Sequence, residues 1–205
     1  MLRSSRSRLR PRGRVVVAAL VLASLTACSG SDGSSSSPSG PASSASSIPT
    51  QEPTPEPVQT VATIATVSGK FNGQLRSRLR DRVAATVDEW IDAAYADGPY
   101  PRVDFADAFG IFTSGAASRA EADRGLMSNA DIGADVDEVV MTNRRLRIDV
   151  LAVQRKAIGV TVRVALGMRL TGARERRERV TGSLFMTYGK GGWHVFGYDM
   201  DRGEV

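Results

Sequence analysis

Several residue types that support common chemistries are almost absent from these 205 residues. The whole chain has one cysteine, Cys28, and one histidine, His194. A single cysteine excludes a disulfide within the chain, so a folded domain must be stabilised by its core alone. One histidine without further cysteines leaves no zinc-type ligand set, and no carboxylate spacing is typical of a calcium loop. We therefore expect no metal and no other cofactor.

Long apolar runs and catalytic motifs are missing too. The longest apolar run, Val15 to Ala27, has 13 residues, whereas a helix needs about 20 to cross a bilayer. The stretch Gly189-Lys190-Gly191-Gly192 joins two predicted strands and leads into no helix, so it is not a phosphate-binding loop. No nucleophile in a tight turn accompanies His194 to complete a Ser-His-Asp triad. The sequence therefore favours a binding protein over an enzyme.

What the chain does contain begins with an export signal. Six arginines and no acid occupy the first 14 residues, the apolar run follows, and Leu25-Thr26-Ala27-Cys28 closes it. These four residues resemble the lipobox of bacterial lipoproteins. The resemblance implies that residues 1–27 are removed and that a diacylglyceryl group on the Cys28 sulfur anchors the chain to the extracytoplasmic face of the cell membrane. The alternative is an ordinary signal peptide followed by a chance cysteine.

The charge of the chain is concentrated in that signal. The formal net charge is +5 for the whole sequence, but it is −1 once residues 1–27 are removed. The high isoelectric point is therefore no argument for nucleic-acid binding, and we expect no nucleic-acid partner. Arginine outnumbers lysine 24 to 3, a bias typical of the GC-rich genomes of actinobacteria.

A polar segment follows the proposed lipid site. Residues 29–58 contain 11 serines and 6 prolines and neither lysine nor arginine. Such a segment buries too little apolar surface to offset its chain entropy, so residues 28–69 are predicted to be a lipidated cysteine and a disordered tether. Within it, residues 59–69 alternate apolar and polar side chains. An edge strand and a loose linker remain equal alternatives for them.

Residues 70–205 are predicted to form one folded domain that opens with helices. Apolar residues recur at spacings of three and four from Phe71 to Tyr95, and Asp97-Gly98-Pro99 then ends the helix. Asp104 is predicted to cap a short second helix. Ser118-Arg119-Ala120-Glu121 matches a capping box and predicts that a third helix starts at Ser118.

From Val139 onward the apolar period changes to two. Alternation predicts four strands, around Leu146 to Val150, Ile158 to Leu170, Val180 to Tyr188 and Trp193 to Met200. Short links and one polar face favour antiparallel pairing, with Gly167 and Gly182 as bend sites and the last residues as a frayed end. The expected fold is α+β, with N-terminal helices on a curved four-stranded antiparallel sheet.

This element order, together with Gly191-Gly192-Trp193-His194-Val195, resembles the nuclear transport factor 2-like superfamily, also called cystatin-like α+β. The resemblance implies that the long helix packs in the concave face of the sheet beside a cone-shaped cavity. Trp90, Tyr95 and Tyr188 are the candidates to line that cavity. No residue aligns with the catalytic motif of family members that are enzymes, so no catalytic role is assigned.

Arginines gather on the polar face of the predicted strands, where they meet either an anionic partner or neighbouring carboxylates that neutralise them. They are Arg145, Arg147, Arg163, Arg169, Arg177 and Arg179, and Asp149, Glu175 and Glu178 lie among them. Our first hypothesis is a lipid-anchored extracytoplasmic binding or interaction module without catalysis. The alternatives are an isomerase- or cyclase-type enzyme that uses the cavity, and an accessory subunit of a membrane-transport or cell-wall complex.

Overall fold

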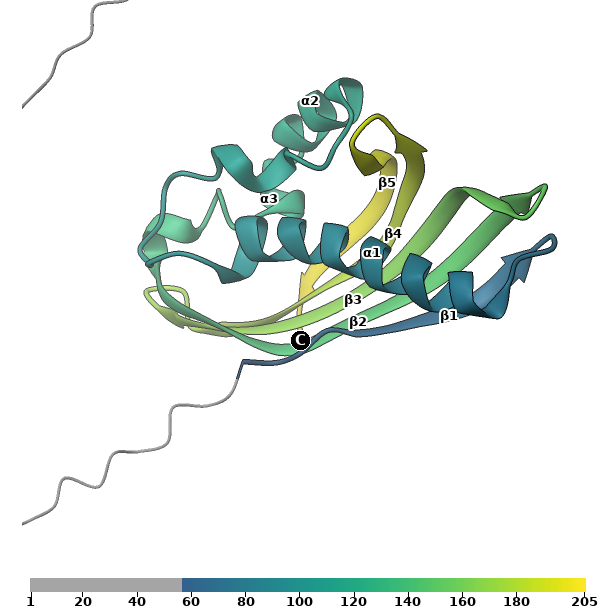
Figure 1. Ribbon diagram of the computed structural model, residues 1–205. Helices are drawn as coiled ribbons and strands as arrows, with labels where there is room; N and C mark the ends of the chain where they lie inside the picture. Colours follow the sequence, from purple (N-terminus) through teal and green to yellow (C-terminus); the bar gives the residue numbers. More distant parts are fainter. Residues whose placement is uncertain (1–56) are drawn as a thin grey trace, which may run out of the picture. The chain divides into compact units, whose positions relative to one another are not determined.

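The computed structural model describes residues 57–205. The predicted signal peptide, Cys28 and the tether as far as residue 56 lie outside the described residues, so those interpretations stay predictions. Residues 57–205 form an α+β unit in which the helices cover one face of a curved sheet (Figure 1). The broad fold class is therefore as expected.

The sheet differs from the expectation in its first strand. Its order is β1-β2-β3-β4-β5, with bounds Val61–Ser68, Val136–Val153, Lys156–Gly172, Arg176–Gly189 and Gly192–Glu204. The last four strands pair antiparallel with their neighbours in sequence, as predicted. β1 pairs parallel with β2, so the prediction of a four-stranded antiparallel sheet is wrong, and of the two alternatives for residues 59–69 the edge strand is confirmed. Ala62, Ile64 and Val67 pack against the core, and this burial stabilises the strand.

The long helix α1 (Gly73–Ile91) crosses the concave face of the sheet (Figure 1). The Asn72 side chain caps it by accepting a hydrogen bond from the Gln74 N–H (2.9 Å). The π-helical turn η1 (Asp92–Ala96) extends it, and Gly98 follows at φ +94°. The predicted helix and its stop are confirmed, although Leu75 at its start is 40% exposed.

Four short elements complete the helical layer: η2 (Ala106–Phe109), α2 (Ser114–Ala122), α3 (Arg124–Met127) and η3 (Gly133–Asp135). Asp104 accepts a hydrogen bond from the Ala106 N–H (3.0 Å) at the start of η2, but Phe105 and not Asp104 holds the N-cap position. The capping box at Ser118 is wrong, because Ser118 lies in the middle of α2. Residues just before α2 bond to β5 through the Thr113 N–H and the Val195 carbonyl (2.9 Å), and this long-range pairing sets the earlier start.

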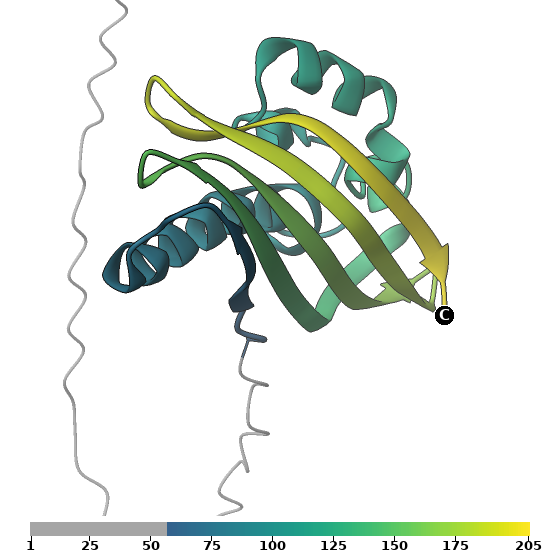
Figure 2. The same cartoon turned by 90° about the vertical axis from the view of Figure 1, so that its right-hand side faces the viewer.

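Both predicted bend sites lie at irregular points of the sheet. The pairing register of β2 shifts between Met141 and Asn143, opposite Gly167. Gly182 adopts φ +145°, and a Cβ there would collide with the Asp199 carbonyl oxygen. Only glycine adopts such a conformation without strain. These positions accompany the curl that wraps β3, β4 and β5 around the helical layer (Figure 2).

Candidate functional site

Two of the three cavity candidates belong to the core. Trp90 and Tyr95 have no solvent exposure and meet edge to face, with ring centroids 5.5 Å apart. The Trp90 Nε1–H donates to the Met127 carbonyl oxygen (3.2 Å), and the Tyr95 hydroxyl donates to that of Leu126 (2.8 Å). Burial raises the pKa of Tyr95. Both side chains fill the space between helices and sheet, and of the two only Trp90 borders a surface hollow, the one beside His194.

The third candidate, Tyr188, lies apart from them at the end of β4. It is 59% exposed, and its ring meets that of Trp193 edge to face at 5.5 Å. Trp193 itself is buried. The structure therefore places Tyr188 at the rim of the concave face, where it does not share a cavity with Trp90 and Tyr95.

His194 borders a surface hollow of about 410 Å³ between α1, η2 and the β4–β5 hairpin. Trp193 forms part of its wall, and Glu89 and Asp107 supply exposed carboxylates. The Nε2 atom of His194 lies 3.1 Å from the Lys190 carbonyl oxygen. The described residues show no hydrogen bond or ion pair between the histidine and either carboxylate, so the hollow offers no assembled acid–base pair.

A buried ionic cluster lies at the other end of the sheet and was not predicted from the sequence. Glu178 is 3% exposed and accepts hydrogen bonds from the Arg202 guanidinium. Arg202 also donates to the Ser128 carbonyl (2.6 Å), the Gly125 carbonyl (3.0 Å) and the Asn129 side-chain oxygen (2.8 Å). Glu178 has the same strand parity as Val180 and Leu184, and this signal marked it as inward-facing. The predicted position of Glu178 on the polar face is therefore wrong, and so is the frayed end at Arg202.

A second anchoring contact joins α1 to the sheet. Arg144 of β2 donates to Asp92 (2.7 Å) and to Asp88 (2.8 Å). Burial acts to lower the pKa of Arg144, but the bonds from Asp92 and Asp88 outweigh it and raise that pKa. Arg144 is thus a structural residue, distinct from the arginines on the opposite face of the sheet.

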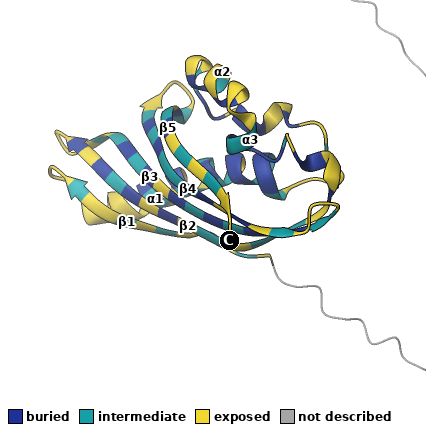
Figure 3. Cartoon of the chain, turned by 180° about the vertical axis from the view of Figure 1, so that it is seen from behind, coloured by how far each residue is buried: buried dark blue, intermediate teal, exposed yellow. Residues whose placement is uncertain are grey.

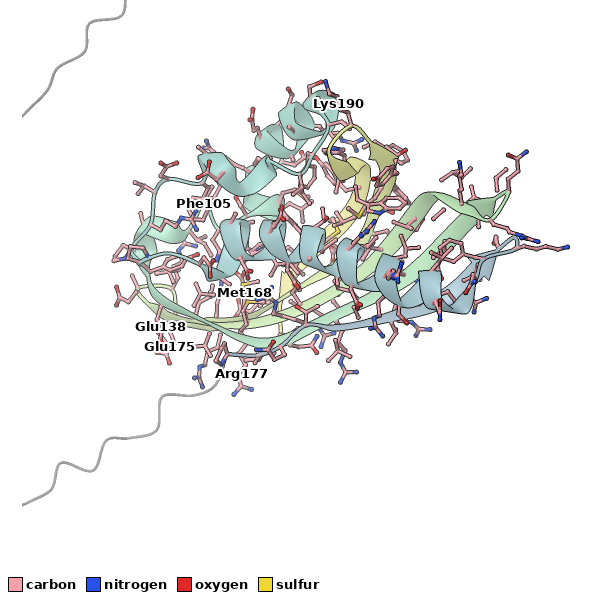
Figure 4. All side chains as sticks on the ribbon, in the orientation of Figure 1. Phe105, Glu138, Met168, Glu175, Arg177 and Lys190 are labelled. Atoms are coloured by element: carbon pink, nitrogen blue, oxygen red, sulfur yellow. The ribbon has the colours of Figure 1, made fainter. Side chains whose placement is uncertain are left out.

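The outer face of the sheet carries no helix of the described residues (Figures 1 and 2). Buried and more exposed residues alternate along the strands, so polar positions face outward (Figure 3). In Figure 4, Arg177 points away from the helices, whereas Met168 lies between α1 and the sheet. By the same alternation the arginine face, as we call it, consists of Arg145, Arg147, Arg163, Arg169, Arg177 and Arg179, all exposed and drawn from β2, β3 and β4.

Strand register brings these arginines together. Arg147 is directly opposite Arg163, and Arg169 is directly opposite Arg177. Asp149 neutralises Arg163 at 2.7 Å. Within residues 57–205, no ion pair engages the other five members of the arginine face. Like charges directly opposite on neighbouring strands are destabilising. The Arg169–Arg177 pair therefore lowers the stability of the sheet, and packing gives no reason for the two arginines to be there.

The surface between these arginines is shallow. Ala165, Gly167 and Thr181 occupy outward positions there. A hollow of about 220 Å³ lies over Gly167 beside Arg177 and Arg179. Besides Asp149, the outer face carries Glu138 near one end of β2, and Asp199 and Asp201 on β5 opposite Ser183 and Thr181. The outer face is thus a cationic surface with some carboxylates and a hollow over Gly167.

Residues 57–205 contain no helix long and apolar enough to cross a bilayer. They also contain no group of three histidine, cysteine, aspartate or glutamate side chains able to hold a metal ion. In comparisons with known proteins, the chain matches no family model and no curated protein.

Proposed function

We propose that this chain is a lipid-anchored, extracytoplasmic binding module whose arginine face holds an anionic partner. The observation that carries the proposal is the Arg169–Arg177 pair, two arginines directly opposite in register, neither of which forms an ion pair within residues 57–205. An anion that bridges the two guanidinium groups relieves their repulsion, because arginine binds carboxylates and phosphates through two parallel hydrogen bonds. The long helix on the concave face of a curved sheet supports the resemblance to the nuclear transport factor 2-like superfamily.

The filled interior favours a surface site over an isomerase- or cyclase-type site in a cavity. A small-molecule enzyme needs a concave pocket with a few convergent polar groups. The cavity candidates Trp90 and Tyr95 are instead fully buried, and their polar atoms bond to backbone carbonyls.

The anchor is tested by Cys28→Ala. The wild-type protein should partition into membranes and detergent, because two acyl chains hold a protein stably. Cys28→Ala removes the only sulfur that can carry them, so the variant should be released or retained as unprocessed precursor, two outcomes distinguished by mass. A normally cleaved Cys28→Ala that stays membrane-bound after a salt wash would contradict the lipid anchor.

The anionic partner is tested by binding of the detergent-solubilised wild-type protein to phosphocellulose. Arg169→Ser/Arg177→Ser should elute at clearly lower salt than wild type, since each phosphate contact contributes to the salt dependence. Arg76→Ser/Arg78→Ser is the matched control, because it removes the same charge from exposed positions on α1. Equal losses in the two variants would mean that only net charge matters and would refute a role for the arginine face.

A further inference from the structure

We infer that the anionic partner of the arginine face is the phospholipid surface of the membrane that anchors the chain, so that the domain lies with β2, β3 and β4 against the headgroups. This inference rests on the proposed function and names the partner of the same site. Its basis is the shape of the face, the position of its charges and the point at which the rest of the chain joins it.

The shape of the arginine face fits a planar partner. Small outward residues lie between the arginines, among them Ala165, Gly167 and Thr181. Long cationic side chains project from three neighbouring strands, beside the hollow over Gly167. Arginines near an anionic membrane each contribute about 1 kcal/mol of attraction, and an array spread over three strands lets several of them act together.

The two edges of the sheet differ in charge. Asp199 and Asp201 lie on the edge strand β5, opposite Ser183 and Thr181 of β4. Val61, 57% exposed, is on the opposite edge strand and is the register partner of Arg145. An apolar side chain beside a cation matches the boundary between headgroups and acyl chains.

The point of attachment brings the face to the membrane. β1 starts at Val61, beside Arg145. The chain that leads back to Cys28 therefore leaves the domain at the edge of the arginine face. As the flexible coil that its composition predicts, a segment of that length would have a root-mean-square span of roughly 30 Å. Tethering at such a range gives the domain an effective concentration at the membrane of order millimolar. At that concentration the docked state is populated even when the electrostatic attraction is weak.

The docked orientation can be measured on the lipidated protein. Thr181→Cys places a thiol in the arginine face, and Val103→Cys places one on an 81% exposed residue of the helical side, near Phe105 in Figure 4. With Cys28 blocked by its lipid, each introduced thiol is the only site for a fluorescent dye. The labelled proteins are reconstituted into vesicles that carry headgroup-spin-labelled lipid, a quencher, in phosphatidylcholine alone or in three parts phosphatidylcholine to one part phosphatidylglycerol.

We expect quenching of the dye at position 181, and not at position 103, on phosphatidylglycerol vesicles only. Quenching should vanish in molar salt, where the Debye length is about 3 Å. Arg169→Ser/Arg177→Ser should lower the ratio of docked to free domain about thirty-fold, the product of two contributions of about 1 kcal/mol each. The control Arg76→Ser/Arg78→Ser should leave that ratio unchanged.

Three results would overturn the inference. Equal quenching at positions 103 and 181 means that the domain has no fixed orientation. Absence of quenching at position 181, with phosphocellulose binding that still depends on Arg169 and Arg177, means that the face binds a soluble anionic polymer or an acidic protein, so the proposed function survives without membrane docking. Absence of both effects removes the proposed function as well.

Discussion

Replacement of Arg202 by methionine tests whether the buried ionic cluster holds the C-terminal strand to the helical layer. Arg202 is the partner of Glu178 and also donates to the carbonyl groups of Gly125 and Ser128 at the end of α3. Arg202→Met keeps a long apolar side chain but removes every one of these hydrogen bonds. Within residues 57–205, Glu178 then keeps only Arg176 as an ionic partner.

The expected cost follows from burial. Removing one partner of a buried ion pair costs about 3–5 kcal/mol, because the remaining charge is left uncompensated. Because Glu178 keeps its contact with Arg176, we expect a loss at the lower end of this range, about 3 kcal/mol in the free energy of unfolding. That is a large share of the 5–15 kcal/mol typical of a domain, and it corresponds to a fall in Tm of roughly 6–12 °C.

Urea denaturation followed by tryptophan fluorescence measures this loss, since Trp90 and Trp193 are both buried. The control is Arg174→Met, whose ion pair with Asp135 is 48% exposed on each side and should contribute less than about 1 kcal/mol. The double variant Glu178→Leu/Arg202→Met should regain part of the loss, because no buried carboxylate is then left unpaired. If Arg202→Met is no more destabilising than Arg174→Met, the cluster does not stabilise the fold.

Three further outcomes are expected. Trp193→Ala should lower the free energy of unfolding by about 3–5 kcal/mol through the cavity it leaves; unchanged stability in urea would instead place Trp193 in a ligand platform. Gly182→Ala should cost about 1–3 kcal/mol because of its positive φ and the collision with Asp199, whereas Gly203→Ala, which meets nothing within 4 Å, should be nearly neutral by the same assay. Burial, followed by the hydrogen bond to Asp123, raises the pKa of Tyr198 to about 12. An unfolded tyrosine ionises near pH 10, so the contribution of Tyr198 should be complete below that pH and decline as the pH rises towards 12. Unfolding curves of Tyr198→Phe across this range should show a shallower decline, and an identical slope would exclude the effect.

The local sequence pattern was sufficient to predict those parts of the fold whose conformation is determined by neighbours in sequence. The apolar alternation from Ile158 to Leu170 predicts both β3 and the face it buries, because strand side chains alternate whatever the strand pairs with. The stop of the long helix at Gly98 follows from backbone sterics at that residue. The outward arginines were found in the same way, as the polar half of each alternating strand.

Pairing between distant residues was not determined by such patterns. Alternation in residues 59–69 left strand and linker open, because a marginal strand forms only where a partner edge is free, and β2 supplies one in parallel. The start of α2 moved to Ser114 because β5 bonds the preceding residues.

The charged residues show most clearly which features the sequence determines and which depend on the tertiary structure. The sequence alone determined that six arginines share one face, since parity depends only on position along each strand. Only the tertiary structure decided which charges are neutralised: register sets Arg169 against Arg177, while Glu178 finds Arg202 across 24 residues of chain. The energy of an ion pair depends on distance and burial, and both are properties of the assembled sheet.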